Sequence, residues 1–575
     1  MNILPEDMTV NTVLKRLADN DVNGITFITS ADRQEFISYA DFIESIEFCL
    51  YNLLEQGIVA GDELLIQVED QQSFLTVFWS AMMGGIIAVP LAVGNQAEQQ
   101  KKVLQVWRQL SRPWVVADAQ GAKNLQKLDD QGRSVANCMA QRSVDIGSLM
   151  LRRKRHTGVP AARPGDLAYV QYSSGSTGVP KGVLLTHSNL CANVSAILKR
   201  SGTTPTDSML SWMPLSHDMG MICFHMCGIF SGVDQFIMPT GLFIRRPLLW
   251  MQVVSEKKVT QLYSPNFGQQ FFLMALKKNT AVDWDLSSVR ILFNGAEQIS
   301  PWVCREFLET LAPFGLKGNI MYPAYGLAEA SVAVSLPDPS DELRTYAAER
   351  SSLRPGHPVL FSDDGNTATH FVEVGYAIPD CAVRITHAGN VLPEKWLGSI
   401  EIKGRNVTQG YYGFPEDADE LFTPDGWLRT GDLGFLANGR LVFTGRTKNV
   451  IIINSQNYFP HDLENLLLSI PGIELGKLVI TSCWNEGSQK EELLVFVNYK
   501  EDDENFLSLK QEISRKLITA VGLLVEKVIP VRKIPKTTSG KIQQYLLTDA
   551  YLAGEYDEVL ERLTNPANTH KLITK

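Results

Sequence analysis

A loop rich in glycine and hydroxyl residues constrains this chain more than any other segment. It occupies residues 173–182, reads Ser-Ser-Gly-Ser-Thr-Gly-Val-Pro-Lys-Gly and follows an apolar run at residues 167–172. The run predicts a strand that delivers the loop to the rim of a sheet. The N–H and hydroxyl groups and the lysine of such a loop can wrap a polyphosphate. The alternative is an ordinary Gly/Ser linker, and the loop is not a Walker A loop, because no Gly-Lys-Ser/Thr ends it.

Length, charge and cysteine usage limit the class of protein. A chain of 575 residues is too long for one core, so we expect two or more domains. Its formal net charge of −10 argues against a nucleic-acid partner. The longest apolar stretch, residues 80–93, is too short to span a bilayer, and residues 1–7 lack the features of a signal peptide. The eight cysteines are scattered, and the pair Cys223 and Cys227 is typical of a core, which together indicates a cytoplasmic protein.

Short apolar runs alternate with longer amphipathic ones along the chain, which favours an α/β fold. The alternation is clear at residues 63–90, where two short apolar runs flank a helical one. Residues 337–372 are rich in Pro, Gly, Ser and Asp and predict an irregular insertion. The pattern begins anew after Gly445-Arg446, so we predict an N-terminal domain at 1–445 and a C-terminal domain at 446–575.

Six further segments combine polar or charged side chains with glycine or proline. They are residues 213–220, 294–297, 325–329, 427–434, 445–448 and 535–541. Taken alone, each has a simpler interpretation: a helix-capping turn at 294–297, a turn with a solvated charge at 325–329, an exposed lysine at 541. A buried, neutral histidine is the simpler interpretation of His217, and a structural turn that of Asp432. The case for function therefore depends on their order.

That order resembles the adenylate-forming superfamily, which includes acyl- and aryl-CoA synthetases, peptide-synthetase adenylation domains and firefly luciferase. The resemblance covers nearly the whole chain. It implies a large N-terminal domain of stacked α/β subdomains with a β-barrel-like subdomain. It also implies a small, mobile α+β C-terminal domain that rotates between the two steps of the reaction, a hinge motion.

The resemblance also implies ATP and Mg²⁺ as cofactors and assigns roles to single residues. The implied catalytic residues are Lys541, which bridges carboxylate and α-phosphate, His217 at the acyl site and Glu329 as the Mg²⁺ ligand, a role that suits a carboxylate oxygen. The implied nucleotide-binding residues are Ser173, Ser174, Gly175, Ser176, Thr177, Gly178 and Lys181 at the phosphates, Asn294, Gly295, Ala296, Glu297, Tyr325 and Gly326 at the adenine, Asp432 and Arg446 at the ribose and Lys448 at the hinge.

Within the superfamily the chain is most similar to fatty acyl-AMP ligases and to the acyl-ligase loading domains of polyketide and peptide synthetases. The similarity rests on residues 212–220, 246–250, 264–267 and 325–331 and on the insertion after Glu329. It implies an acid–thiol ligase that converts a fatty or related carboxylic acid to acyl-AMP with release of pyrophosphate. The acyl group would then pass to the phosphopantetheine thiol of a carrier protein, in polyketide, antibiotic, lipopeptide or lipid biosynthesis.

Some positions depart from the pattern of this branch. Ser455 stands where relatives commonly have glycine, which bears on the thiol-transfer step, and Gln544 stands where many have a basic residue. No Asp-Ser-Leu carrier signature follows Lys541, so the carrier would be a separate chain or would have been cut away from this one.

Two alternatives to the acyl-AMP ligase remain open. An acyl-CoA or aryl-CoA synthetase would share the motifs, but the insertion and the sequence Arg246-Pro247-Leu248 argue against it. A non-catalytic adenylate-binding protein is disfavoured because Lys541, Glu329, Asp432 and Arg446 are all present.

Overall fold

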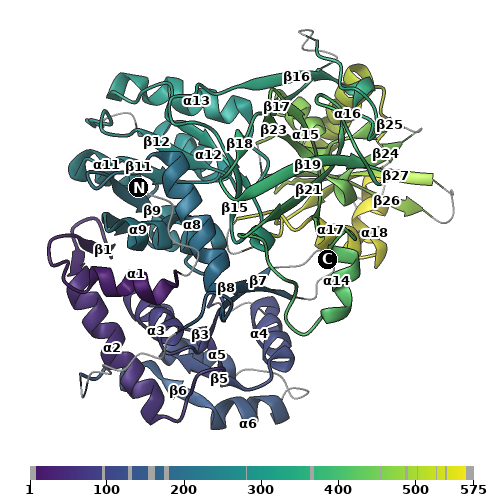
Figure 1. Ribbon diagram of the computed structural model, residues 1–575. Coiled ribbons are helices and arrows are strands. Elements are labelled where there is room, and N and C mark those ends of the chain that lie inside the picture. The colour runs from purple at the N-terminus through teal and green to yellow at the C-terminus, as the bar shows by residue number, and fades with distance from the viewer. Residues whose placement is uncertain are drawn as a thin grey trace. The chain divides into compact units, whose positions relative to one another are not determined.

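The chain folds into two compact units, shown in one ribbon in Figure 1. The computed structural model describes residues 8–564 apart from 94–96, 127–132, 153, 155–161, 174–179, 280–281, 363–367, 454–455, 475, 486–489, 501–502, 526 and 538–539. The first unit contains Met1–Leu343, Val374–Val383 and Glu401–Arg429, and the second contains Arg344–Glu373, Arg384–Ile400 and Thr430–Lys575. The predicted phosphate-loop residues Ser174, Gly175, Ser176, Thr177 and Gly178 and the departure Ser455 lie outside the described residues.

The larger sheet of the first unit has seven strands in the order β13-β12-β11-β9-β10-β1-β2. The strands are β1 (Gly24–Ile28), β2 (Gln34–Ser38), β9 (Ser208–Ser211), β10 (Asp234–Ile237), β11 (Gln261–Tyr263), β12 (Ile291–Asn294) and β13 (Met321–Pro323). All neighbours are parallel except β1 and β2. Parallel sheets are covered by helices on both faces, which explains the near-continuous apolar runs of these strands.

The second sheet of this unit has six strands in the order β6-β5-β3-β4-β7-β8. They are β3 (Glu63–Gln67), β4 (Ile87–Pro90), β5 (Pro113–Ala117), β6 (Ser143–Asp145), β7 (Leu167–Ser173) and β8 (Lys181–Thr186). Only β8 runs antiparallel to its neighbour. The predicted strands at 63–68, 86–90 and 167–172 are confirmed, and so is the helix between the first two. The fold class is α/β, as predicted.

The helices of this unit begin where the sequence supplies caps. The Ser38 hydroxyl accepts from the N–H of Asp41 at the start of α2 (Tyr39–Glu55), and Thr186 and Asn189 form a capping box on α8 (His187–Ser201). Helices α2 and α3 (Gln71–Met83) pack side by side. The others are α1 (Val10–Leu17), α4 (Ala97–Gln109), α5 (Ala119–Gln126), α6 (Arg133–Gln141), α7 (Ile146–Leu149), α9 (Cys227–Ser231), α10 (Thr240–Arg245), α11 (Leu249–Lys257), α12 (Asn266–Leu276), α13 (Pro301–Leu311) and α14 (Ala418–Leu421).

A third, small sheet of the first unit carries a tight turn. Its strands β14 (Tyr325–Gly326), β15 (Ala333–Leu336) and β18 (Tyr376–Ala377) are antiparallel, and the single-turn helix η4 (Ala328–Ala330) lies between the first two. A π-helix, η2 (Met219–Met226), precedes α9. Helix η4 contains Glu329, and η2 begins just after His217. The resemblance assigns both residues to the site.

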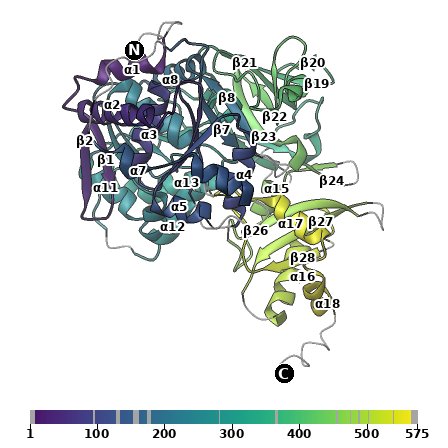
Figure 2. The ribbon, with the colours of Figure 1, turned by 90° about the horizontal axis from the view of Figure 1, so that it is seen from below.

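The second unit contains a three-stranded sheet of β26 (Leu478–Asn485), β27 (Lys490–Asn498) and β28 (Lys527–Val531). One face packs against α15 (Pro460–Leu467) and α16 (Asp503–Val521), and the other packs against α17 (Gln544–Leu552). Helix α18 (Asp557–Thr564) lies beside β28 (Figure 2). The antiparallel pair β24 (Ile451–Ile453) and β25 (Gln456–Tyr458) completes this part.

The predicted insertion is more regular than its composition suggests. Strands β16 (Thr345–Glu349) and β17 (Ala368–Val372) pair antiparallel within it. Their half-polar sequences, Thr-Tyr-Ala-Ala-Glu and Ala-Thr-His-Phe-Val, show no clear alternation of polar and apolar residues. The sequence therefore predicts an irregular segment from the turn-forming residues between them and misses the two strands.

A five-stranded sheet follows the insertion in the chain. Its strands are β19 (Cys381–His387), β20 (Asn390–Val391), β21 (Gly398–Gly404), β22 (Leu428–Ala437) and β23 (Arg440–Arg446). They pair in an open order, so the described strands need no closed barrel. Within the described residues, no helix is both long enough and apolar enough to cross a bilayer.

Candidate active site

The turn that carries Glu329 is held by buried side-chain amides. Nδ2 of Asn193, on α8, donates to the carbonyls of Ala330 and Ala333 at 3.0 and 2.8 Å. Nδ2 of Asn406 donates to the same two carbonyls at 3.2 and 3.1 Å. Ser331, just after the turn, has a φ of 64°, a conformation that non-glycine residues rarely adopt. Four hydrogen bonds that buried amides donate to backbone carbonyls thus hold the turn that presents Glu329.

The carboxylate of Glu329 lies in a cluster with Tyr411, Lys181 and Asp417. The Tyr411 hydroxyl donates to Oε1 of Glu329 at 2.7 Å. The ammonium of Lys181 lies 4.9 Å from the centroid of the Tyr411 ring and 2.6 Å from Oδ2 of Asp417. Burial raises the pKa of Tyr411 well above its ordinary value, and the charge of Glu329 raises it further. The hydroxyl therefore keeps its proton and remains a hydrogen-bond donor.

The two ends of the predicted phosphate loop are neighbours in the sheet. Ser173 ends β7, Lys181 begins β8, and the two residues are paired across the strands. The two described residues that flank the predicted loop are therefore held next to each other at one end of the β7–β8 pair. The Cβ that a larger residue would add at Gly182 would lie 2.7 Å from the Val170 side chain, so the strand pairing after Lys181 depends on glycine.

His217 lies in the turn before η2 and near the end of β7. Its Nδ1 lies 2.8 Å from Oδ1 of Asp218, and the side chains of both residues are 16% exposed. Nε2 of Gln171, on β7, donates to the carbonyl of Ser216 at 3.1 Å, and the Tyr169 hydroxyl donates to the Gln171 side chain. The strand that precedes the predicted phosphate loop thus also holds the turn of His217.

The predicted adenine segment directly follows β12. Asn294 is fully buried, and its Nδ2 lies 3.3 Å from Sγ of Cys304. Ala296 has a φ of 70°, which is strained for alanine and often marks a functional site. The Glu297 carboxylate accepts from the N–H of Phe267 at 2.6 Å. The side chains of Asn294 and Glu297 therefore contact other parts of the protein. The backbone at Ala296 is strained, as is common at functional sites.

Tyr325 and Gly326 form β14, close to the Glu329 turn. Tyr325 is buried. A Cβ at Gly326 would collide with the carbonyl oxygen of Val332, so only glycine fits there. The close approach of these two chain segments sets the turn between β14 and β15 on which Glu329 stands.

The second unit brings two of its predicted site residues together. Asp432 on β22 and Arg446 on β23 are paired across the hairpin, and Nε of Arg446 lies 3.3 Å from Oδ1 of Asp432. The Asp432 side chain is 5% exposed and that of Arg446 is 53% exposed. The exposed Lys448 follows in a 3₁₀ turn at Thr447–Asn449. The pairing gives the buried carboxylate a fixed orientation.

Lys541 lies in a tight turn of the same unit. Its N–H donates to the Thr537 hydroxyl at 3.1 Å, and its carbonyl accepts from the N–H of Thr537 at 2.8 Å. Gly540 has a φ of 87°, which the turn requires and which favours glycine. Thr537 and Gly540 thus hold the backbone of the predicted catalytic lysine.

The profile of the AMP-binding enzyme family matches residues 16–412 of this chain. The chain belongs to the AMP-binding enzyme family. A Caulobacter vibrioides protein that carries the name of an acyl-CoA synthetase is 30% identical to it, over 91% of this chain and 92% of that protein. The long-chain-fatty-acid–AMP ligase FadD26 of Mycobacterium marinum is also 30% identical, over 87% of this chain and 89% of that protein.

Solved structures match this AMP-binding enzyme over nearly its whole length. The structure of McyG A-PCP complexed with phenylalanyl-adenylate has a TM-score of 0.87 at 28% identity and covers 99% of this chain and 87% of that one. A fatty acyl-adenylate ligase structure, from work on the E. coli and L. pneumophila enzymes, has a TM-score of 0.85 at 26% identity. It covers 96% of this chain and 100% of that one.

Several residues of this AMP-binding enzyme's candidate site escaped the sequence analysis. They are the buried amides Asn193 and Asn406, Gln171 on β7, Tyr411 and Asp417. Gln171 alone leaves a local signal, because it is a polar residue inside an apolar strand. The others contact partners that are 73 to 236 residues away in the chain, so no local pattern reveals them.

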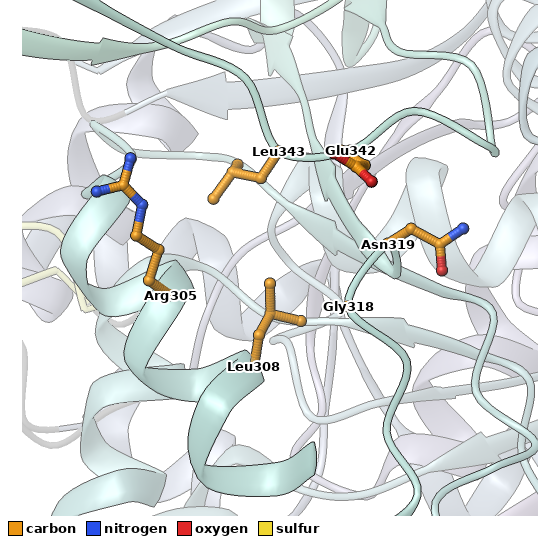
Figure 3. A pocket seen from close by; sticks show the side chains of 6 residues that line it. All are labelled: Arg305, Leu308, Gly318, Asn319, Glu342 and Leu343. Carbon is orange, nitrogen blue, oxygen red and sulfur yellow. The ribbon is translucent and has the colours of Figure 1, made fainter.

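A surface cavity of about 420 Å³ lies in another part of the first unit. Its lining comes from Arg305 and Leu308 on α13, from Gly318 and Asn319 before β13, and from Glu342 and Leu343 (Figure 3). None of these residues belongs to the predicted motifs. The cavity is therefore separate in sequence and in lining from the candidate active site.

Proposed function

We propose that this enzyme uses ATP to convert a fatty or related carboxylic acid to its acyl adenylate, with release of pyrophosphate. The observation that carries the proposal is the meeting of Glu329 and Lys181 on either side of Tyr411. A carboxylate for a hard cation and an ammonium for phosphate oxygens are the groups that a metal–triphosphate needs side by side. The fatty-acid–AMP ligase name of one relative supports an acid as the co-substrate.

In the proposed step, a carboxylate oxygen of the acid attacks the α-phosphorus of ATP. The bond from that phosphorus to the pyrophosphate oxygen breaks, so acyl-AMP and pyrophosphate form. Lys541 meets the negative charge that develops between the carboxylate and the α-phosphate, and Asp432 with Arg446 holds the ribose. His217 orients the carboxylate, and Lys181 binds the phosphates.

The carboxylate at position 329 fits Mg²⁺ on the chemistry of the donor. Mg²⁺ prefers oxygen ligands and is usually held by one or two carboxylates together with substrate phosphates. Glu329 supplies such an oxygen on a fixed turn, and the Tyr411 hydroxyl occupies only one of its two oxygens in the structure. When bound, Mg²⁺ would neutralise phosphate charge during the transfer.

For the second step we propose transfer to the phosphopantetheine thiol of a carrier protein. The thiol loses its proton to the solvent, its sulfur attacks the acyl carbonyl carbon, a thioester forms, and AMP leaves with the electron pair of the cleaved C–O bond. The name of the A-PCP structure that this chain resembles supports a carrier, whereas the acyl-CoA synthetase name of another relative makes CoA the second candidate. We propose that the product of this step enters polyketide, antibiotic, lipopeptide or lipid biosynthesis.

The insertion supports the acyl-AMP ligase branch. Arg350, in the insertion, forms a two-pronged ion pair with Asp462 on α15, at 2.6 Å from Nε to Oδ2 and 3.1 Å from Nη2 to Oδ1. Phe371 of β17 packs edge-on against Phe459. The insertion thus contacts the segment at the start of the proposed C-terminal domain (446–575), and this contact supports the branch because the resemblance implies an insertion that packs against the small domain. We propose that this domain moves about Lys448 between the two steps and that the enzyme works in the cytoplasm, where its free cysteines would stay reduced.

The test is mass spectrometry of the products from ATP, Mg²⁺ and a pool of aliphatic and aromatic acids. CoA and a phosphopantetheinylated carrier protein are both offered. Acyl-carrier without acyl-CoA would support the proposal and identify the acid. Acyl-CoA as the main product would make the chain a CoA synthetase. No pyrophosphate with any acid, despite ATP binding, would contradict the proposal in favour of a non-catalytic binding protein.

A further inference from the structure

Tyr411 touches both charged groups of the proposed metal–phosphate site with different parts of one side chain. The hydroxyl donates to Glu329 at 2.7 Å, and the ring lies under the ammonium of Lys181 with 4.9 Å between nitrogen and centroid. A movement of the Tyr411 ring would change both contacts at once, because the hydroxyl is rigidly attached to the ring. The residue therefore links two groups that are 148 positions apart in the chain.

The backbone around Tyr411 prevents the side chain from drifting. The Leu184 N–H donates to the carbonyl of Gly410 at 3.2 Å, and the Tyr412 N–H donates to the carbonyl of Gly182 at 2.7 Å. The segment is therefore tied to β8 on both sides of Tyr411.

The same segment is tied to the Glu329 turn. The Thr408 N–H donates to the carbonyl of Glu329 at 2.8 Å, and the Thr408 hydroxyl donates to the carbonyl of Leu184 at 2.6 Å. Residues 408–412 thus join the strand of Lys181 to the turn of Glu329 through both backbone and side chain.

We propose that Tyr411 is a positioning residue that aligns the Glu329 carboxylate for Mg²⁺ and holds the Lys181 ammonium for the phosphates of the same nucleotide. The proposal rests on the function proposed above. A donor to one carboxylate oxygen fixes the plane of the carboxylate and leaves the other oxygen for the metal. Such outer contacts typically change metal affinity by about 10- to 100-fold. The ring face adds attraction for the ammonium without competing for its hydrogen bonds.

A purely structural role would have a different signature. If the hydroxyl only satisfied a half-buried polar group, its removal would lower the stability of the fold and affect nucleotide binding equally with and without metal. If it positions Glu329, its removal affects only the part of nucleotide binding that depends on Mg²⁺. The two roles therefore separate in a binding experiment that needs no turnover.

The experiment measures the Kd of α,β-methylene-ATP by titration calorimetry, once in Mg²⁺ and once in EDTA. Tyr411→Phe removes the hydroxyl and keeps the ring. We expect about tenfold weaker binding in Mg²⁺ and unchanged binding in EDTA. Tyr411→Leu also removes the ring and should weaken binding in EDTA as well, because Lys181 loses its support. Tyr412→Phe is the matched control, since it deletes the neighbouring hydroxyl, which donates to Glu63 and also contacts the Ser111 hydroxyl, and it should change neither Kd.

Three results would overturn the positioning role: an unchanged Kd in Mg²⁺ for Tyr411→Phe, an equal loss in both media, or a Tyr411→Phe chain that does not fold. The proposed function fails separately. If the wild-type chain shows Mg²⁺-enhanced binding that depends on Tyr411 but releases no pyrophosphate with any acid, the positioning role stands and the acid-activating reaction does not.

Discussion

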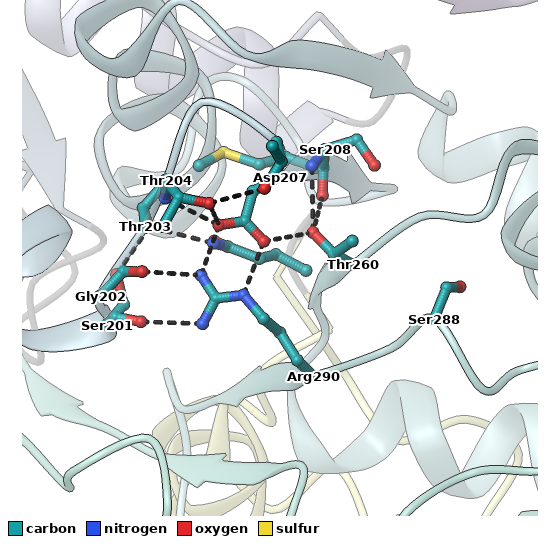
Figure 4. Close-up of polar contacts among 12 residues, drawn as sticks. Ser201, Gly202, Thr203, Thr204, Asp207, Ser208, Thr260, Ser288 and Arg290 are labelled. Atoms are coloured by element: carbon teal, nitrogen blue, oxygen red, sulfur yellow. Dashed lines mark hydrogen bonds and ion pairs between the residues drawn. The ribbon is translucent and has the colours of Figure 1, made fainter.

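Two polar networks of the first unit use similar residues for different ends. In the first network (Figure 4), Arg290 donates to both oxygens of Asp207, at 2.6 and 2.7 Å. Arg290 also donates to the carbonyls of Ser201 and Gly202, where α8 ends, at 3.0 and 3.3 Å. The Thr260 hydroxyl donates to Asp207 at 2.7 Å. Every oxygen of this buried carboxylate is used by the protein.

The second network, Glu329, Tyr411, Lys181 and Asp417, leaves its charged groups within reach. The side chains of Lys181 and Asp417 are 33% and 25% exposed, whereas that of Asp207 is 4% exposed. One described donor, Tyr411, reaches the Glu329 carboxylate, against several at Asp207. A saturated, buried network holds the fold together, and we propose that a partly exposed network, also built on charged side chains, receives a ligand.

Removal of the Asp207 carboxylate should have the largest effect on stability. Asp207→Ala leaves the Arg290 guanidinium without its partner in a mostly buried place, and we expect a loss of about 3 kcal/mol in the free energy of unfolding. That is the lower end for buried pairs, because the Arg290 side chain is 29% exposed. Urea unfolding measures the loss. Asp285→Ala, which breaks the pair with Lys258 where both side chains are 55% exposed, is the control and should cost less than about 1 kcal/mol.

Equal losses for Asp207→Ala and Asp285→Ala would contradict the comparison. They would mean that burial does not distinguish the first network from an ordinary surface pair. A loss of ATP binding in a folded Asp207→Ala chain would contradict the comparison more strongly, because the first network would then contribute to nucleotide binding as well.

Removal of the Lys181 ammonium should give the opposite result. Lys181→Met keeps the length of the side chain and removes the charge, so the fold loses a partly exposed ion pair, worth at most about 1 kcal/mol, and the contact of the ammonium with the Tyr411 ring. ATP loses a charge-assisted hydrogen bond, which predicts a KM for ATP that rises by about 10- to 100-fold. Pyrophosphate release against ATP concentration measures it. An unchanged KM for ATP would exclude Lys181 from phosphate binding.

The two networks also differ in what the sequence could reveal. Lys181 and Glu329 stand in short motifs whose order indicates the family, so both could be predicted. Asp207 and Arg290 are 83 residues apart and Tyr411 and Glu329 are 82 apart, and such pairings depend on tertiary packing. The strands also differ in whether the sequence could predict them. Strands buried on both faces, such as β3 and β4, leave continuous apolar runs, whereas the half-polar strands β16 and β17 leave no period to recognise.

Acid should weaken the first network over a pH range that follows from the pKa of Asp207. Burial alone would raise the pKa of Asp207, but hydrogen bonds from Arg290, Thr204 and Thr260 outweigh it and lower the pKa below the usual 3.8. The folded chain therefore binds this proton less readily than the unfolded chain does. The stabilisation is complete above about pH 4 and is lost as the pH falls through the folded pKa, by at most about 1.4 kcal/mol per pH unit.

Urea unfolding of the wild type and of Asp207→Asn, measured from about pH 6 to about pH 3, tests this window. The variant cannot take up the proton, so its stability should fall less steeply below about pH 4 than that of the wild type. Parallel curves would show that the Asp207–Arg290 pair is not the acid-sensitive part of the fold.

Substitution of Asp417 should have the smallest effect on nucleotide binding. It tests whether Asp417 competes with the phosphates for Lys181 or holds Lys181 in place for them. Its carboxylate lies 2.6 Å from the Lys181 ammonium, and both side chains are partly exposed, so the pair is worth at most about 1 kcal/mol. If the nucleotide phosphates replace Asp417 as the partner of Lys181, Asp417→Asn should lower the Kd of α,β-methylene-ATP in EDTA by up to about fivefold. Asp419→Asn, the same change of charge at an exposed neighbour, is the matched control and corrects for the altered net charge. Weaker binding in Asp417→Asn would reverse the assignment: Asp417 would hold Lys181 in place for the phosphates, and the second network would resemble the first in depending on its internal ion pair.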